Sequence, residues 1–199
     1  MGRSACWGFF VLALLFAFTA SSDASGAPPA YRIALDVNYT EGTFRGELIL
    51  TYENHASAPL EEIFFRLCAN ARSLYGSASL DVGEARADGE SVLVSLLADN
   101  TVLLVPLGRP LAPGASAEIT LSFLGRAATA PPEGGFLSET EYGLLLKSSH
   151  ALTLTAFYPS VAPYTEEGWA IDPVSALGDA LFADSATYDV TLRVESEVT

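Results

Sequence analysis

The sequence predicts an all-β domain, built as an antiparallel β-sandwich or as a saddle-like open sheet. Three observations support this prediction. Apolar and polar residues alternate with a period of two along many short runs, turn-forming residues separate these runs about every ten residues, and no run has a convincing helical period. Strands of this kind have one wet face, so their apolar faces must be stacked against each other. Half of the 199 residues are hydrophobic, which is enough for one core, and we expect one domain.

The first 26 residues have the pattern of a secretory signal peptide. Arg3 supplies a positive charge, residues 5–20 form an apolar run, and small residues with possible cleavage points after Ala24 or Gly26 follow. The apolar run is shorter than the roughly 20 residues of a spanning helix, so an uncleaved anchor is the weaker alternative. We therefore expect an exported protein, extracellular or in the periplasm or cell envelope, which meets a membrane only through an uncleaved signal segment.

Residues 27–30 form a short linker, and the domain is expected over residues 31–199. Residues 31–38 and 42–54 alternate regularly around a short turn, which predicts a hairpin. Residues 60–70 also fit a helical stripe, but consecutive Ile, Phe and Phe residues favour a buried strand.

Further strands follow to the end of the chain. They are expected at 79–85, 91–97, 101–107, 115–126, 142–147, 151–159 and 187–195, with turns at Asp88-Gly89 and Asp99-Asn100 and loops at 108–114 and 127–135. The last strand places Tyr188, Val190, Leu192 and Val194 on one face and would leave an exposed sheet edge. That edge suggests a fragment or a polypeptide that continues.

Charge and cysteine content exclude several classes of function. Ten basic and 24 acidic residues give a net charge of −14, which disfavours nucleic acids and anionic membranes as partners. Cys6 lies in the signal segment, so the mature chain keeps only Cys68 and has no internal disulfide. The apolar neighbours of Cys68 predict a buried, inert thiol.

No catalytic motif is present. His55 and His150 lack the H-E-x-x-H spacing of zinc peptidases, and no G-x-S-x-G, G-x-G-x-x-G or P-loop sequence occurs. Glu166, Glu167 and Asp172 have no spacing that defines a catalytic carboxylate pair. Asp172, Asp179, Asp184 and Asp189 lack the short regular spacing and the glycine of a calcium loop. We expect no catalytic residue, metal or cofactor in this chain.

The segment 157–173, F-Y-P-S-V-A-P-Y-T-E-E-G-W-A-I-D-P, is the most unusual part of the sequence. Its prolines interrupt strand pairing and predict a rigid corner. Tyr158, Tyr164 and Trp169 have three open interpretations: they pack the corner, form a domain interface, or offer a contact surface to a ligand.

The order of several motifs resembles the N-terminal β domain of aminopeptidase N-like (gluzincin) zinc metallopeptidases, in their bacterial form. Residues 31–54 resemble the opening hairpin with its closing asparagine, and residues 59–70 resemble the next strand, which ends near an asparagine. Residues 110–126 resemble the L-x-x-G-x-x-x-x-L-x-I-x-F-x-G strand, and residues 157–169 resemble the proline corner. The segment G-D-x-x-F-x-x-x-A-x-Y-D-V begins at Gly178.

The resemblance implies a non-catalytic domain that covers the catalytic cleft of an exported peptidase. The zinc, its H-E-x-x-H ligands and the activity, proteolysis from peptide N-termini, would belong to a catalytic domain in cis beyond Thr199, and this chain would be inactive alone. Peptides would be partners through that domain. In the family, a Gln or Glu about nine residues before the corner proline binds the substrate's α-amine, and here His150 stands nine residues before Pro159. The alternative function is a secreted β-sandwich module that binds a glycan, a surface or a protein.

Overall fold

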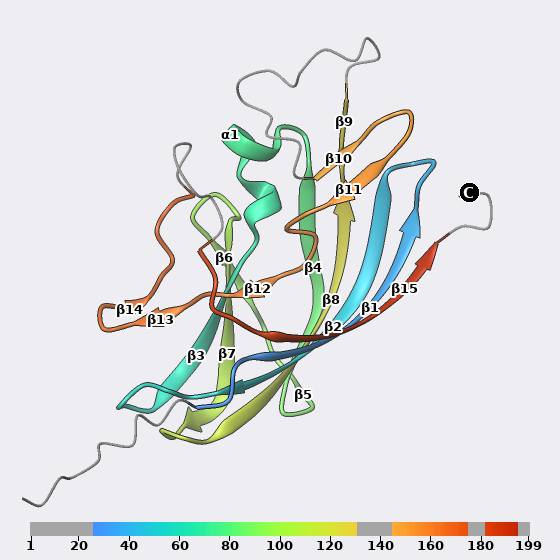
Figure 1. The fold of residues 1–199 in the computed structure, drawn as a ribbon. Helices are drawn as coiled ribbons and strands as arrows, with labels where there is room; N and C mark the ends of the chain where they lie inside the picture. Colours follow the sequence, from blue (N-terminus) through green and yellow to red (C-terminus); the bar gives the residue numbers. More distant parts are fainter. Residues whose placement is uncertain (1–25, 131–144, 175–181, 195–199) are drawn as a thin grey trace, which may run out of the picture.

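The computed structural model of the chain describes residues 26–130, 145–174 and 182–194 (Figure 1). Its larger layer is a six-stranded sheet in the order β15-β1-β2-β8-β4-β5. The bounds of these strands are Ala30–Asn38 (β1), Thr43–Glu53 (β2), Ser79–Ala87 (β4), Glu90–Ser91 (β5), Ser116–Arg126 (β8) and Thr187–Val194 (β15).

A four-stranded sheet in the order β12-β3-β7-β6 forms the second layer. Its strands are Leu60–Arg66 (β3), Ser95–Leu97 (β6), Val102–Leu111 (β7) and Ser160–Val161 (β12). One apolar core joins residues of both sheets, among them Leu48 and Leu121 of the larger sheet and Phe65 and Val105 of the smaller. The predicted all-β, sandwich-like fold is therefore confirmed.

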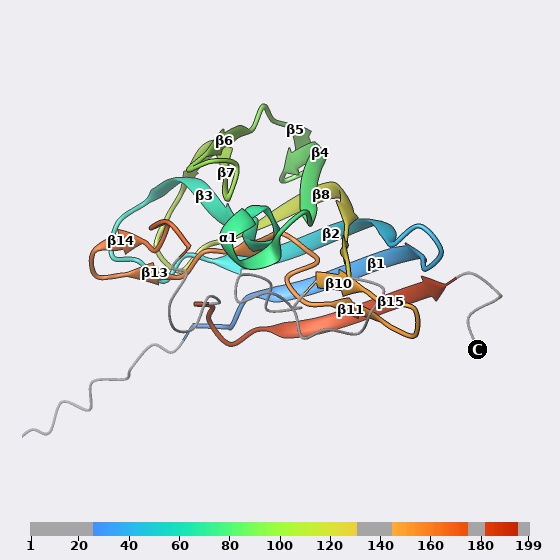
Figure 2. The same cartoon turned by 90° about the horizontal axis from the view of Figure 1, so that it is seen from above.

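Smaller elements close the sides of the sandwich (Figure 2). These elements are a three-stranded sheet, β11-β10-β9, a two-stranded sheet, β13-β14, and two short helical segments between β3 and β4. Their bounds are Cys68–Asn70 (η1), Arg72–Tyr75 (α1), Ala128–Thr129 (β9), Leu145–Lys147 (β10), Leu152–Leu154 (β11), Tyr164–Thr165 (β13) and Gly168–Trp169 (β14).

The predicted first hairpin is confirmed, since β1 and β2 pair antiparallel from Ala30–Thr51 to Asn38–Thr43. β8 then pairs with β2 along its whole length. The alternating pattern sends the apolar side chains of all three strands to the core, because neighbouring residues of a strand point to opposite faces.

Two phenylalanines and two glycines interlock on the inner faces of β2 and β8. Phe44 lies opposite Gly125, and Gly46 lies opposite Phe123. A Cβ atom at Gly125 would overlap the Phe44 ring, and one at Gly46 would overlap the Phe123 ring. Each glycine thus leaves the space that the facing aromatic ring occupies, which makes the pairing register specific.

The turn predictions hold where loop residues must adopt positive φ. Asp88 and Gly89, with φ of 50° and 83°, join β4 to β5 as the two-residue turn typical of a hairpin. Asp99 and Asn100 also have positive φ, in the turn between β6 and β7.

Several strand predictions need correction, and of the strand expected over 151–159 only Leu152–Leu154 (β11) forms. The strand expected over 60–70 ends at Arg66 and is followed by η1 and α1, because Leu67, with φ of −107° and ψ of 63°, departs from the extended conformation. The strand expected over 91–97 is reduced to β5 and β6, at the exposed edges of two different sheets. β7 extends into the loop expected over 108–114 and ends at Leu111, so Pro110 lies in a strand, and the loop is confirmed only from residue 112. The predicted antiparallel pairing fails for β15, which runs parallel to β1.

Cys68 is buried and free, as predicted. Burial raises the pKa of its thiol, more than the nearby Arg66 lowers it, and keeps it protonated and unreactive. Within the described parts, no helix is long and apolar enough to cross a membrane. Apart from Gly26, the predicted signal peptide lies outside the described residues, as does Gly178 of the bacterial motif.

Candidate functional site

The two histidines lie on separate loops of the described structure. His55 follows β2, where its Nε2 atom lies 3.0 Å from the Ala27 carbonyl oxygen and its Nδ1 atom lies 3.8 Å from Glu53. His150 is exposed in the loop between β10 and β11, where its backbone N–H donates to Ser148 Oγ at 3.2 Å. Among the described residues, no group of three or more His, Cys, Asp or Glu side chains could hold a metal ion.

The corner segment, residues 157–173, crosses from the three-stranded sheet to the edge of the four-stranded sheet. It follows Ala156, whose φ of 54° turns the chain away from β11. Phe157 then meets the edge of the Phe44 ring, with 6.4 Å between centroids. Pro159 is buried, and the following residues pair with β3 as strand β12. The predicted corner is therefore confirmed, and its first residues cover the core.

Three tyrosines from distant parts of the chain meet at this corner. Tyr31 and Tyr188, register partners on β1 and β15, stack with centroids 5.1 Å apart and planes 6° apart. Tyr158 packs edge-on against Tyr31 at 5.4 Å, and its hydroxyl lies 2.8 Å from that of Tyr188. The backbone N–H of Val161 donates to Tyr31 Oη at 2.8 Å. The tyrosine cluster thus holds β1, β15 and the corner together.

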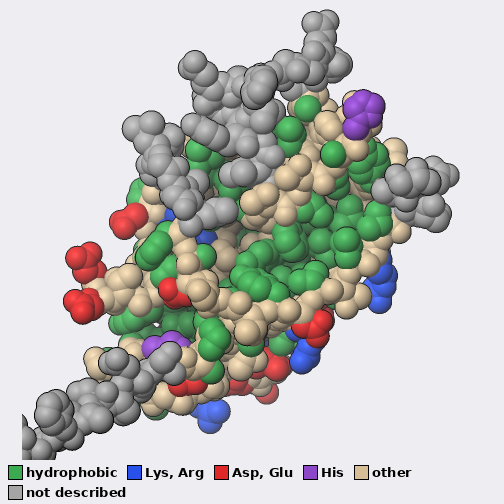
Figure 3. Space-filling view, in the orientation of Figure 1, with side chains coloured by type: hydrophobic (Ala, Val, Ile, Leu, Met, Phe, Trp, Pro, Cys, Tyr) green, Lys and Arg blue, Asp and Glu red, His purple; other side chains and the backbone are tan. Residues whose placement is uncertain are grey.

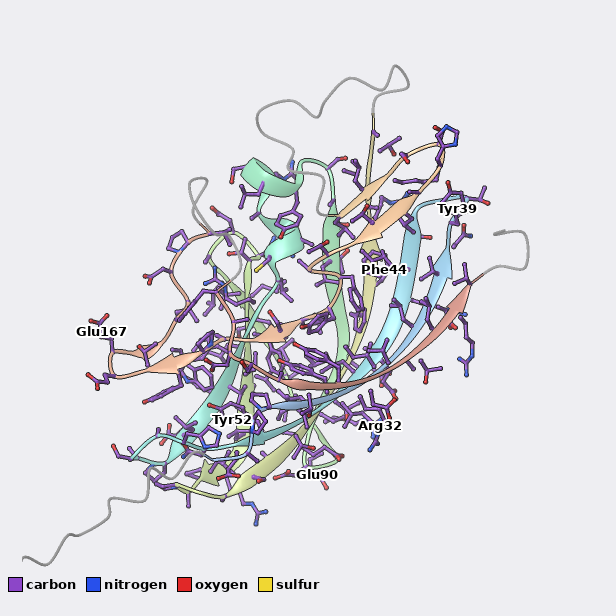
Figure 4. All side chains as sticks on the ribbon, viewed as in Figure 1. Arg32, Tyr39, Phe44, Tyr52, Glu90 and Glu167 are labelled. Atoms are coloured by element: carbon purple, nitrogen blue, oxygen red, sulfur yellow. The ribbon has the colours of Figure 1, made fainter. Side chains whose placement is uncertain are left out.

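Burial raises the pKa of two phenols of the cluster, Tyr31 and Tyr158. Desolvation raises the pKa of Tyr31 far above its ordinary value and does the same for Tyr158. It also raises the pKa of Tyr52, at the other end of β2 from Phe44, to about 12 (Figure 4). The Tyr31 and Tyr158 hydroxyls are both engaged within the cluster, since Tyr31 Oη accepts from the Val161 N–H and the Tyr158 hydroxyl lies 2.8 Å from that of Tyr188. The cluster therefore has a structural role.

Trp169 anchors the second half of the corner. The centroid of its ring lies 5.7 Å from that of Tyr52 and 5.8 Å from that of Phe64. The Tyr164 ring packs against it in an edge-to-face arrangement, with 5.1 Å between centroids. The guanidinium of Arg66, which is only 9% exposed, donates to the carbonyl oxygens of Asp172 at 2.6 Å and Ala170 at 3.3 Å. One buried cation thereby ties the end of the corner to β3.

These positions distinguish the three interpretations of the aromatic residues. Tyr158 and Trp169 are half-buried with their rings against neighbours, which favours corner packing over a contact surface. Tyr164 is 37% exposed. Glu167 lies at the tip of the β13–β14 hairpin (Figure 4), where it is solvated like Glu166. An interface role for the aromatic residues and a substrate role for His150 stay predictions.

Sequence reasoning missed the residues that fasten the corner, namely Tyr31, Tyr188 and Arg66. Tyr31 and Tyr188 each stand at the start of an alternating strand, but the alternation does not say which strands are neighbours. Arg66 interrupts an apolar run, and a charge within a buried strand is a signal that could have indicated a buried partner.

Replacing Tyr31 with phenylalanine is expected to destabilise the fold by about 1–2 kcal/mol, because the buried N–H of Val161 loses its acceptor. Urea unfolding at pH 7, followed by Trp169 fluorescence, measures the change. Tyr39→Phe is the matched control, since its hydroxyl makes only a 3.4 Å bond to the Ser148 carbonyl oxygen and should cost well under 1 kcal/mol. Equal effects of the two changes would contradict the role given to Tyr31.

The sandwich and its corner define an all-β domain whose fold has counterparts in larger chains. It matches part of the crystal structure of a variant M1 zinc metallopeptidase from Deinococcus radiodurans, at 22% identity and a TM-score of 0.50, over 84% of this chain and 32% of that chain. A two-domain M1 zinc metallopeptidase bound to L-arginine gives 19% identity, a TM-score of 0.48 and coverage of 85% and 33%. Another M1 zinc metallopeptidase structure from Deinococcus radiodurans has 20% identity and a TM-score of 0.47. The match covers 86% of this chain and 33% of that chain.

The first of these matches shows a shared fold, and the resemblance seen in the sequence is thereby confirmed for the fold. At this level of identity it shows the fold alone. The chain spans 32% of the length of that solved structure. No protein-family model matches the sequence, and a search of curated proteins finds no match.

Proposed function

We propose that this chain is the non-catalytic N-terminal β domain of an exported, aminopeptidase N-like zinc metallopeptidase. The observation that carries the proposal is the partial fold match, in which nearly all of this chain corresponds to about a third of an M1 zinc metallopeptidase. The order of motifs along residues 31–194 supports the same family, because it includes the hairpin, the proline corner and the closing A-x-Y-D-V strand.

In this proposal, the domain covers the catalytic cleft and limits access to peptide N-termini. The zinc ion and the residues that activate water belong to a catalytic domain in cis, as does contact with peptides. The signal-like N-terminus supports export to the cell envelope or beyond. A domain of this kind needs rigidity more than reactive groups, which agrees with a corner held by neutral tyrosines and a buried arginine.

The purified chain is expected to hydrolyse no aminoacyl-anilide and to hold no stoichiometric zinc. Anilide release, with the solved peptidase as positive control, and elemental analysis measure the two quantities. Turnover together with one zinc per chain would overturn the proposal.

The nucleotide sequence after codon 199 tests whether a catalytic domain follows this domain in the same polypeptide. An open or frameshifted frame that encodes H-E-x-x-H supports the proposal. A stop codon followed by unrelated sequence contradicts it and favours the alternative, a secreted binding module.

A further inference from the structure

Strand β15 is the outermost strand of the six-stranded sheet, and no described strand pairs with its other side (Figures 1 and 2). The backbone N–H of Thr187 donates to the Pro29 carbonyl oxygen at 2.9 Å, toward β1. Because backbone groups alternate in direction along a strand, residues 188, 190, 192 and 194 direct their N–H and C=O groups away from β1. Among the described residues, this edge is open to another strand.

The apolar face of the sheet continues onto β15, where its side chains are about half exposed. Tyr188, Val190, Leu192 and Val194 are 51%, 49%, 54% and 44% exposed. Their register partners on β1, namely Tyr31, Ile33, Leu35 and Val37, are at most 8% exposed. Figure 3 shows hydrophobic side chains gathered over the region of β1 and β15 on this face. Such a continuous apolar strip at an open edge is typical of an interaction surface.

The opposite face of β15 carries one charge of each sign. The Asp36 carboxylate forms ion pairs with two cations, Arg193 at 3.5 Å and Arg45 at 3.4 Å. Because one negative charge faces two positive charges, Arg193 is only partly neutralised. Asp189 has no ion-pair partner among the described residues. β15 therefore presents an unpaired acid near one end and an incompletely neutralised base near the other.

We propose that β15 pairs antiparallel with β15 of a second copy of this chain, about a two-fold axis at Thr191. In this register, Asp189 of each copy faces Arg193 of the other. On the apolar face, Tyr188 meets Val194 and Val190 meets Leu192, so both sheets join into one continuous sheet with a shared apolar face. The residues that direct backbone groups outward are those that exchange hydrogen bonds across the axis.

Charge selects this register over its neighbours. With the axis at Val190, Asp189 and Arg193 both lie opposite threonines. With the axis at Leu192, Arg193 lies opposite Thr191, and Asp189 lies opposite a position beyond the end of the strand. An axis at Asp189 or at Arg193 brings two like charges together. A slip by an odd number of residues turns the apolar face of one copy to the polar side. This inference is independent of the proposed function, because it uses only the surface of β15.

Sedimentation velocity of the full chain, at about 0.15 M salt, measures the association. The chain is expected to dimerise. Asp189→Arg should weaken dimerisation at least tenfold, because two attractive pairs become repulsive, and adding Arg193→Asp should restore it. Asp36→Asn, which removes only the contact within one copy, should leave the dimer intact. A monomer at all concentrations up to about 100 μM, or no rescue by the charge exchange, overturns the proposal and leaves the edge to another protein or to a strand in cis.

Disulfide trapping tests the register separately. At the two-fold axis, Thr191 is a non-hydrogen-bonded pair with a Cα separation of about 4.5 Å, within disulfide range. Thr191→Cys should therefore form a covalent dimer under mild oxidation, whereas Thr187→Cys, on the same face and equally exposed, should not. The native Cys68 is buried and does not compete. Equal cross-linking at both positions would contradict the register, and circular dichroism of each variant confirms folding.

Discussion

Replacing Phe44 with alanine is expected to lower the free energy of unfolding by about 3–5 kcal/mol. Phe44 is 1% exposed and lies over Gly125, which has no side chain to fill the space that the ring would leave. The change also removes the contact with Phe157, at the start of the corner. The cavity would therefore open where the larger sheet, the β2–β8 register and the corner meet.

Urea unfolding of the Phe44→Ala chain, followed by far-ultraviolet circular dichroism and Trp169 fluorescence, measures the loss. Phe182→Ala is the matched control, because Phe182 is 65% exposed and should change stability by less than about 0.5 kcal/mol. Similar stability of the two variants would show that Phe44 does not occupy the core position assigned to it.

Replacing Asn54 with alanine is expected to cost about 2–4 kcal/mol, although no apolar contact is lost. The side chain is 1% exposed, and its amide donates to the Leu111 carbonyl oxygen at 2.7 Å and the Ala58 carbonyl oxygen at 3.0 Å. Its Oδ1 atom accepts from the backbone N–H of Ala56 at 2.8 Å. Alanine would leave three backbone groups without their partner, at the point where β2 leads to β3.

Asn38→Ala is the control for this prediction. Asn38 makes one exposed hydrogen bond, from the Glu41 N–H at 2.8 Å, and its loss should cost under about 1 kcal/mol. The difference between the two free energies of unfolding, from urea titrations of both variants, is the measured quantity. A cost below 1 kcal/mol for Asn54→Ala would mean that water replaces the three bonds, and the loop would not depend on this side chain.

The asparagines that close two motifs of the sequence resemblance have a structural explanation. Asn54 ends the first hairpin motif, and Asn70 ends the next. The Asn70 amide donates to the carbonyl oxygens of Leu80 and Asn100, and its Oδ1 atom accepts from the Leu80 N–H at 2.8 Å. Both side chains supply hydrogen-bond partners to backbone groups of strands and loops, among them Leu111 in β7 and Leu80 in β4. The sequence located these residues, but the bonds from Asn54 to Leu111 and from Asn70 to Leu80 and Asn100 depend on segments that lie elsewhere in the chain.

The corner was only partly predictable. Its prolines indicated a turn, because proline constrains φ and cannot donate to a ladder. The aromatic residues suggested an interface or a contact surface as readily as packing, since aromatic side chains serve all three purposes. Tyr158 could be assigned to packing only once Tyr31 and Tyr188 were found beside it.

The sequence by itself determined the fold class, the first hairpin, the buried faces of β1, β2 and β8 and the burial of Cys68, because alternation and turn residues act within a few positions of the chain. Only the tertiary structure decided that β15 lies parallel to β1, that Arg66 holds the corner, and that the apolar side of β15 is exposed. These features join residues more than a hundred positions apart. A local pattern says that a strand has an apolar face, but what covers that face depends on which distant segment arrives beside it.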